Sequence, residues 1–209
     1  MTKTHNAESQ KSLSIEDALN LLREGNKRFI SHELIHRDFE VQRRETAEGQ
    51  YPYAVILGCI DSRLPTEIIF DQGIGDVFNV RIAGNVLSEN VLGSLEYACK
   101  VAGAKLILVL GHTSCGAVKG ACDHVEMGNL TGLLKKIEPA MNLVKTPVGV
   151  ARNSSNTDFV NRVARENVKQ SMEGIRKESP ILNEMISQEK IGLYGAMYDV
   201  QSGKVEFIL

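Results

Sequence analysis

The sequence predicts an α/β fold with a mainly parallel central β-sheet flanked by helices. Three short apolar runs, at 53–57, 76–82 and 105–110, are each followed within two residues by a glycine, as expected for buried parallel strands. Segments with apolar residues at helical spacing separate these runs. Strands that alternate with helices form βαβ units. We therefore expect about four parallel strands plus a C-terminal antiparallel strand or hairpin.

Length and composition favour one soluble domain that spans residues 1–209. A chain of 209 residues can bury roughly 70% of its unfolded surface in one core. The net charge of −2, without a basic block, gives no indication of a nucleic-acid partner. No apolar run is long enough for a membrane span, and the amino terminus lacks the apolar segment of a secretory signal. Four cysteines are too few for a disulfide scaffold, so we expect a cytoplasmic protein.

The amino-terminal part is predicted to be a helical arm in front of the sheet. Residues 1–12 are polar, and we expect them to be disordered. Ser14 can cap a helix whose apolar residues recur from Ile15 to Leu22 and continue toward Phe29. We expect residues 13–50 to form this arm, which packs on the sheet or reaches another subunit. Residues 51–209 are expected to form the α/β core.

The remaining elements are predicted from apolar periodicity and from Gly or Pro at their ends. In chain order they are a short helix after Pro65, a strand at 76–82, a helix at 91–99, a strand at 105–110, a helix from 117, a helix at 130–144, a helix at 158–177, a helix after Ser179-Pro180, a strand at 191–198 and an arm at 204–209.

Side chains that bind metals follow two of the predicted strands. Cys59 lies in the segment GCIDSR after the first strand, and His112 and Cys115 lie in GHTSCG after the strand at 105–110. Sites in parallel sheets form at the carboxyl ends of strands, which would bring these residues into one crevice. A catalytic zinc takes three protein ligands and keeps one position open. The sequence therefore predicts a zinc enzyme with a zinc-binding core.

Each cysteine also has an ordinary interpretation as a buried thiol, which is common for free cysteine. The combination of Cys59, His112 and Cys115 at two strand ends favours the metal site over that interpretation. Cys115 also precedes a predicted helix, whose amino-terminal dipole favours the thiolate. Cys99 lies on an apolar helical stripe and is expected in the core, and Cys122 has no ligand residue beside it.

Asp61 and Arg63 could form an ordinary surface ion pair, worth at most about 1 kcal/mol. Beside a metal the same two residues gain a role. A free carboxylate so close to a ligand could itself bind zinc and close the open position. Arg63 would hold Asp61 away through a charge-assisted, bidentate bond. Asp61 could then accept a hydrogen bond from zinc-bound hydroxide and orient it.

These motifs together resemble the β-class carbonic anhydrases. Cys59-x-Asp61-x-Arg63 is followed by His112-x-x-Cys115 at a spacing that resembles the spacing in these enzymes. The resemblance extends from about Ser14 to the closing GAMYDV. It implies one zinc per chain bound by Cys59, His112 and Cys115, with Asp61 and Arg63 as the catalytic residues. It implies reversible hydration of carbon dioxide to bicarbonate and a proton by zinc-bound hydroxide. It also implies a homodimer or homotetramer.

The resemblance to plant-type members further implies a substrate pocket lined by Gln50, Phe78, Tyr97 and Gly116. Members with a bicarbonate inhibitory site carry a tryptophan three residues before the first cysteine ligand. This chain has Ile56 there and contains no tryptophan, although Arg81 matches the arginine of that site. The resemblance therefore implies the open, constitutively active form, in which Asp61 is not a fourth ligand.

Other functions stay open at this point. A hydrolase of carbonyl sulfide or carbon disulfide would have the same metal site, and substrate profiling would separate it. A non-catalytic zinc-binding module is disfavoured by the Asp61–Arg63 pair, because structural zinc sites normally fill all four positions with Cys or His. A metal-free hydrolase that uses Cys115 would contain no zinc.

For the carbonic anhydrase we expect activity to rise above about pH 7. Two thiolates make the metal centre less positive than three histidines would, so it should lower the pKa of its bound water less.

Overall fold

Residues 4–208 are described by a computed structural model, and within them the chain forms a five-stranded sheet of order β2-β1-β3-β4-β5. The first four strands in this order are parallel, and β5 is antiparallel to β4. This arrangement confirms the predicted α/β fold with a closing antiparallel strand. The strands are β1 (Ala54–Gly58), β2 (Val77–Arg81), β3 (Leu106–His112), β4 (Gly192–Tyr198) and β5 (Val205–Phe207).

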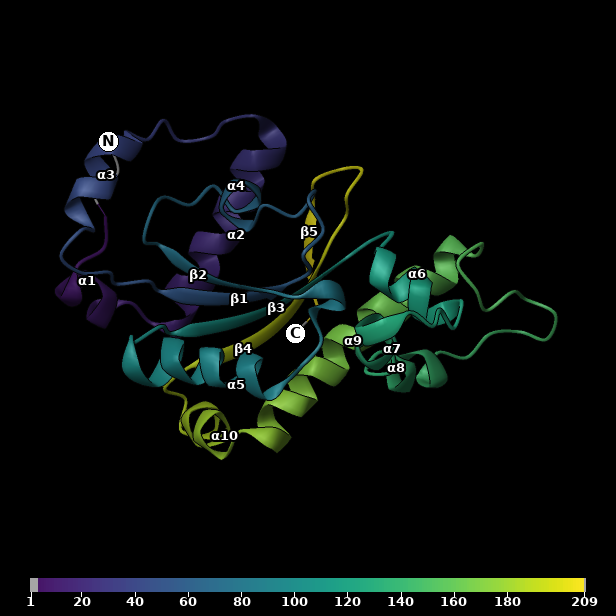
Figure 1. Ribbon diagram of the computed structural model, residues 1–209. Coiled ribbons are helices and arrows are strands. Elements are labelled where there is room, and N and C mark those ends of the chain that lie inside the picture. The colour runs from purple at the N-terminus through teal and green to yellow at the C-terminus, as the bar shows by residue number, and fades with distance from the viewer. Residues whose placement is uncertain (1–3, 209) are drawn as a thin grey trace.

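Helices cover both faces of the sheet (Figure 1). The helices α2 and α4 lie on one face, and α5, α9 and α10 lie on the other, while α6, α7 and α8 gather at one end. No helix within residues 4–208 is long and apolar enough to cross a membrane. The helical elements are α1 (Ala7–Ser12), α2 (Ile15–Ser31), α3 (Phe39–Glu45), α4 (Thr66–Ile69), η1 (Ala83–Asn85), α5 (Glu89–Glu96), η2 (Tyr97–Val101), α6 (Gly116–Cys122), α7 (Gly128–Leu134), α8 (Glu138–Leu143), α9 (Thr157–Glu178) and α10 (Pro180–Ser187).

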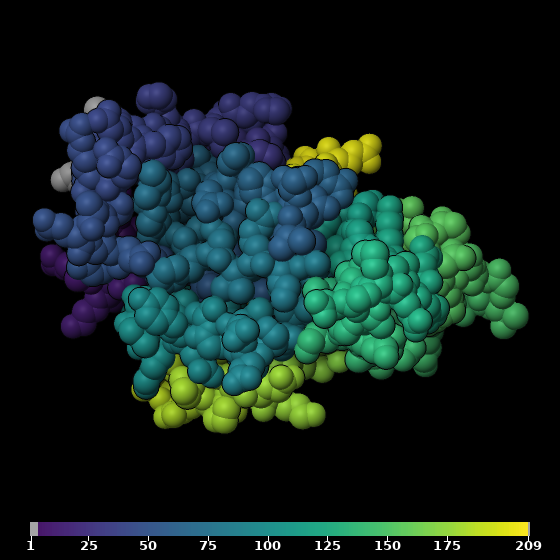
Figure 2. Space-filling view, viewed as in Figure 1, coloured from purple at the N-terminus to yellow at the C-terminus, as the bar shows by residue number. Residues whose placement is uncertain are grey.

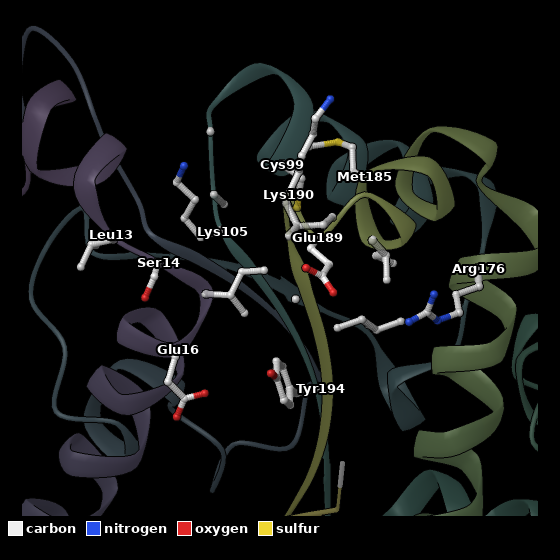
Figure 3. A pocket seen from close by; sticks show the side chains of 17 residues that line it. Leu13, Ser14, Glu16, Cys99, Lys105, Arg176, Met185, Glu189, Lys190 and Tyr194 are labelled. Carbon is white, nitrogen blue, oxygen red and sulfur yellow. The ribbon is translucent and has the colours of Figure 1, made fainter.

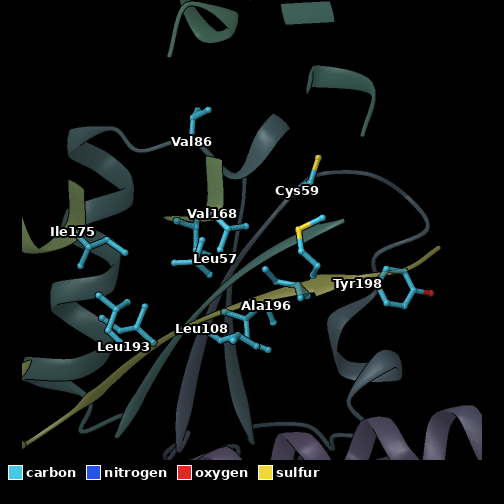
Figure 4. Close-up of a cluster of buried hydrophobic side chains, with 14 of the residues drawn as sticks. Leu57, Cys59, Val86, Leu108, Val168, Ile175, Leu193, Ala196 and Tyr198 are labelled. Atoms are coloured by element: carbon cyan, nitrogen blue, oxygen red, sulfur yellow. The ribbon is translucent and has the colours of Figure 1, made fainter. Parts of the chain in front are cut away.

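The two central strands are completely buried, which explains their continuous apolar sequences. Every residue of β1 and β3 is buried between the two helical layers. In the register, Gly58 at the end of β1 lies opposite Leu110 of β3. The core formed by Leu57, Leu108 and neighbouring side chains extends up to Cys59 (Figure 4). The carboxyl ends of β1 and β3 therefore meet above a closely packed base.

Two predicted boundaries are corrected by the structure. The strand β3 continues through His112, which pairs with Tyr198 of β4, so this histidine ends the strand rather than following it. The helix expected at 130–144 is two helices, α7 and α8. Pro139 lies in the first turn of α8, where a residue without an N–H is tolerated, whereas it would disrupt the interior of one long helix.

The disorder predicted for residues 1–12 is wrong for the part of the segment that forms α1. Asn6 caps this helix, and the buried side chain of Gln10 donates from Nε2 to the carbonyl oxygens of Pro52 and Ala102, at 2.7 and 2.8 Å. The polar composition indicated disorder, and the sequence does not reveal that Gln10 binds two distant carbonyl groups. The predicted disorder of residues 1–3 concerns residues outside those that the structure describes.

The amino-terminal arm is fastened to the core by a buried ion cluster. Asp71, which follows α4, pairs with Arg28 at the end of α2 and with Arg37 in the following loop. Burial opposes ionisation of Asp71, but the hydrogen bonds from both arginines outweigh it, so the net pKa is lowered. The arm therefore forms a continuous flank of the molecule with the core (Figure 2).

Candidate metal centre and catalytic residues

Cys59, His112 and Cys115 meet at the carboxyl edge of the sheet. Cys59 follows β1, His112 ends β3, and Cys115 immediately precedes α6. All three are buried, and their ligand atoms lie within 4.8 Å of one another. The two sulfur atoms are 3.9 Å apart. The structure thus brings together the three residues that the sequence predicted as ligands from two distant segments.

A tight turn between His112 and Cys115 makes this arrangement possible. Ser114 has a positive φ of 56°, and its N–H donates to Oδ1 of Asn161 on α9 at 2.9 Å. Gly111 is required just before the turn, because a Cβ there would lie 2.7 Å from both Met197 and Val168. Close packing of β3 against α9 and β4 therefore fixes where the two ligands of this segment lie.

The imidazole of His112 is oriented to offer one free nitrogen. Its Nδ1 lies 3.0 Å from the carbonyl oxygen of Thr113, and since a carbonyl only accepts, Nδ1 carries the proton. The other nitrogen, Nε2, is buried and has no hydrogen-bond partner among residues 4–208. A buried lone pair without a donor is costly unless a cation binds it. The side chain is therefore prepared for a metal ion.

The two cysteines lie close enough to share a hydrogen bond. The hydrogen bond between Cys115 and Cys59 lowers the pKa of Cys59 and raises the pKa of Cys115, because the protonated thiol stabilises the neighbouring thiolate. The backbone N–H of Gly84 donates to the sulfur of Cys59 at 3.3 Å. Thiolate sulfur and imidazole nitrogen are ligands that suit zinc. The donor set therefore fits this ion.

Asp61 and Arg63 form a bidentate pair next to the three ligands. Arg63 donates from Nε and Nη2 to the two carboxylate oxygens of Asp61, at 2.9 and 2.8 Å, and its backbone N–H adds a third bond. The side-chain hydrogen bond from Arg63 is the main reason that the pKa of Asp61 lies well below its usual range. Oδ2 of Asp61 is 3.9 Å from Nε2 of His112. An ionised carboxylate thus faces the group formed by Cys59, His112 and Cys115.

Arg81, which the sequence associated with an inhibitory site, holds the backbone of this loop. Its guanidinium donates to the carbonyl oxygen of Cys59 at 3.0 Å and to that of Asp61 at 2.5 Å. These bonds fix the segment that carries the first ligand and the carboxylate.

The four predicted pocket residues are distributed unevenly. Gly116 begins α6 directly after Cys115 and so lies at the site. Phe78 and Tyr97 line a separate groove of about 840 Å³ that runs along β2 toward Arg81, with their rings 6.2 Å apart. Gln50 is exposed and precedes the amino end of β1, whereas Cys59 follows the carboxyl end of the same strand. A single chain therefore does not bring Gln50 to the metal ligands.

A larger groove of about 970 Å³ lies elsewhere, near the start of α2 and the amino end of β4, with Cys99 in its lining (Figure 3). Burial alone raises the pKa of Cys99 to about 12, so this thiol stays protonated. Within residues 4–208, only one group of three or more His, Cys, Asp or Glu side chains could hold a metal, and it consists of Cys59, His112 and Cys115. Groove size is therefore a poor guide to the site in this protein.

Several residues that support the site were missed in the sequence. Gly84 contacts Cys59, and Asn161, Asn167 and Ser171 of α9 bind the backbone of the two loops beside the ligands. A polar residue on an amphipathic helix gives no sign that it turns inward, so periodicity alone could not find them. From the sequence, Gly84 could be predicted only as the glycine that follows the strand at 76–82.

A Cys–His–Cys group that could hold a metal, placed at the ends of parallel strands, is typical of a zinc enzyme. Similarity to known proteins identifies the family. The family model described as carbonic anhydrase matches residues 54–205. "Carbonic anhydrase 2" of Mycobacterium tuberculosis is 38% identical over 189 residues, which cover 88% of this chain and 87% of that protein. A carbonic anhydrase of Mycolicibacterium smegmatis is 34% identical over 191 residues, covering 88% and 89%. The chain belongs to the β-class carbonic anhydrases and is an enzyme of that family.

Solved structures agree with this assignment. The β-carbonic anhydrase CafA of Aspergillus fumigatus superposes with a TM-score of 0.70 at 25% identity, covering 92% of this chain and 89% of that one. A Coccomyxa β-carbonic anhydrase superposes with a TM-score of 0.71 over 94% of this chain and 87% of that one. Its identity of 22% supports the fold alone.

Proposed function

We propose that this protein catalyses the reversible hydration of carbon dioxide to bicarbonate and a proton with one zinc ion per chain. The observation that carries this proposal is the buried Cys59–His112–Cys115 group with the Asp61–Arg63 pair directly beside it. Cys59, His112 and Cys115 would hold the ion. When bound, zinc supplies Lewis acidity that lowers the pKa of water and generates a nucleophile near neutral pH.

Asp61 and Arg63 have complementary tasks in this proposal. Asp61 is ionised and accepts a hydrogen bond from the attacking nucleophile, which orients its lone pair toward carbon dioxide. Arg63 occupies both carboxylate oxygens and so keeps Asp61 from closing on the ligands. This geometry supports the open form. The lowered pKa of Asp61 means that its protonation does not limit activity near neutral pH.

The remaining pocket residues support a site completed between two chains. Gln50 lies at the opposite edge of its own sheet, and Tyr97 is 53% exposed in the groove that it shares with Phe78. We propose that the protein is a homo-oligomer in which Gln50, Phe78 and Tyr97 of one chain line the pocket of another, with Gly116 contributed locally. A β-carbonic anhydrase of Sordaria macrospora with the same fold is described as tetrameric. A cytoplasmic location stays part of the proposal.

Substrate profiling of the zinc-loaded protein tests this function. Zinc would be quantified first, and turnover would then be measured with carbon dioxide, carbonyl sulfide and carbon disulfide. We expect about one zinc per chain and a clear preference for carbon dioxide. Faster turnover of either sulfur compound would instead identify a hydrolase. Zinc without turnover of any substrate would identify a binding module, and active protein without zinc would identify a metal-free hydrolase.

A further inference from the structure

Two buried polar residues of α9 touch no metal ligand but bind a loop that does. Asn167 and Ser171 are 2% and 5% exposed, and a spacing of four residues places them on one face of the helix. Asn167 donates from Nδ2 to the carbonyl oxygen of Gly84 at 2.8 Å. Ser171 donates from Oγ to the carbonyl oxygen of Asn85 at 3.2 Å. Two successive carbonyl groups of η1 are thus held by one helix.

The conformation of this loop is unusual and needs such support. Gly84 and Asn85 both have positive φ, 67° and 43°. For a residue other than glycine this backbone conformation is strained, and it persists only where its surroundings hold it. A Cβ at Gly84 would also meet Ile137 at 2.8 Å, so the loop is closely enclosed on its other side. The two bonds from α9 therefore fix peptide planes that could otherwise rotate.

The same loop delivers a hydrogen bond to the metal group. The N–H of Gly84 lies 3.3 Å from the sulfur of Cys59. A donor to a thiolate stabilises its negative charge and fixes its direction, which is what the partners of metal ligands do in other sites. Rotation of the Gly84–Asn85 segment would remove this donor from the sulfur without changing any ligand.

We propose that Asn167 and Ser171 are positioning residues for the metal centre, which act on Cys59 through the backbone of Gly84 and Asn85. This inference rests on the proposed function, because the task of the loop is defined by a metal held by Cys59. Neither residue contacts the reacting atoms, so their loss should weaken metal retention while leaving the three ligands in place.

Zinc affinity measured by competition with a chromophoric chelator tests the inference on the full-length protein. We expect Asn167→Ala to raise the zinc dissociation constant about tenfold or more, and Ser171→Ala to raise it about threefold, because its bond is longer. The cobalt-substituted variants should also show a shifted thiolate-to-metal charge-transfer band. A merely structural role would lower the melting temperature without moving either readout.

Asn26→Ala is the matched control. Asn26 is also buried, and it donates from Nδ2 to two backbone carbonyl groups, those of Ile69 and Gly203, away from the ligands. Asn26→Ala should therefore lower stability and leave zinc affinity unchanged.

The outcomes separate this inference from the proposed function. If the unaltered protein binds zinc and both α9 variants bind it within about twofold of that affinity, the positioning role is overturned while the function stands. If Asn167→Ala does not fold, Ser171→Ala decides by the same limit. If the unaltered protein takes up no zinc, the proposed function is overturned and the positioning role with it.

Discussion

Two aspartate–arginine clusters in this protein share their chemistry but differ in their surroundings. Asp61 and Arg63 lie at the edge of the metal group, with side chains 16% and 52% exposed. Asp71 is 3% exposed and pairs with Arg28 and with Arg37, which is itself 7% exposed. In both clusters the arginine bonds lower the pKa of the carboxyl group.

The difference shows that an ion pair by itself does not indicate function. Beside Asp61 lies Nε2 of His112, a buried nitrogen that lacks a hydrogen-bond partner among residues 4–208. The carboxylate of Asp71 instead receives bonds from Arg28, Arg37 and the backbone N–H of Ile35, all of them in the arm. We therefore propose a chemical role for the first cluster and attachment of the arm for the second, and four predictions test this difference.

The largest effect is expected from removing a ligand that only the first cluster faces. Cys115→Ser should reduce both zinc content and carbon dioxide hydration to background, because serine does not offer the thiolate that zinc favours. Cys122→Ser is the control, since Cys122 lies outside the metal group and burial raises its pKa to about 11. Zinc analysis and stopped-flow hydration measure both variants. Equal loss in the control would contradict the assignment of ligands.

Asp61→Asn should separate activity from stability at the first cluster. We expect turnover to fall by about 100-fold or more, the range typical of groups that handle a proton in the transition state. The free energy of unfolding should change by at most about 1 kcal/mol, because the pair is partly exposed. Glu40→Gln removes an exposed carboxylate that also has an arginine partner, and it should leave turnover unchanged. A variant that lost stability and kept its turnover would contradict the proposed chemical role of Asp61.

Asp71→Asn should give the opposite result. Removing one partner of a buried ion cluster leaves charge uncompensated and typically costs about 3–5 kcal/mol of unfolding free energy. Turnover per zinc-loaded, folded molecule should stay close to that of the unaltered protein. Denaturant unfolding and hydration assays on the same preparation measure the two quantities. Unchanged stability would show that the arm is held by its apolar contacts alone.

The smallest effect is a pH dependence of that stability difference. Because the folded-state pKa of Asp71 lies below its unfolded value, ionised Asp71 stabilises the fold above the unfolded pKa. This contribution is lost as the pH falls through the folded pKa. The difference in unfolding free energy between the unaltered protein and Asp71→Asn should therefore be complete above about pH 5 and shrink below about pH 4. A constant difference over this range would contradict the charged role of Asp71.

The sequence predicted most of the site because metal ligands are limited to a few residue types and strand ends are marked by apolar runs. Cys59, His112 and Cys115 were found in this way, as was the bond between Asp61 and Arg63. The second cluster was missed, because Asp71, Arg28 and Arg37 lie in polar surroundings where only the fold shows that Asp71 is buried. Asn167 and Ser171 were missed for the same reason. The helix at 130–144 was predicted as continuous because its apolar spacing hid the effect of Pro139.

The most direct test of the central claim is stopped-flow hydration of carbon dioxide between about pH 6 and pH 9, on protein with quantified zinc. Asp61→Asn would be measured beside the unaltered protein. We predict about one zinc per chain in both proteins, turnover that rises with pH in the unaltered protein, and little turnover in the variant. Zinc-loaded protein without hydration at any pH, or a rate already constant at about pH 6, would contradict this account.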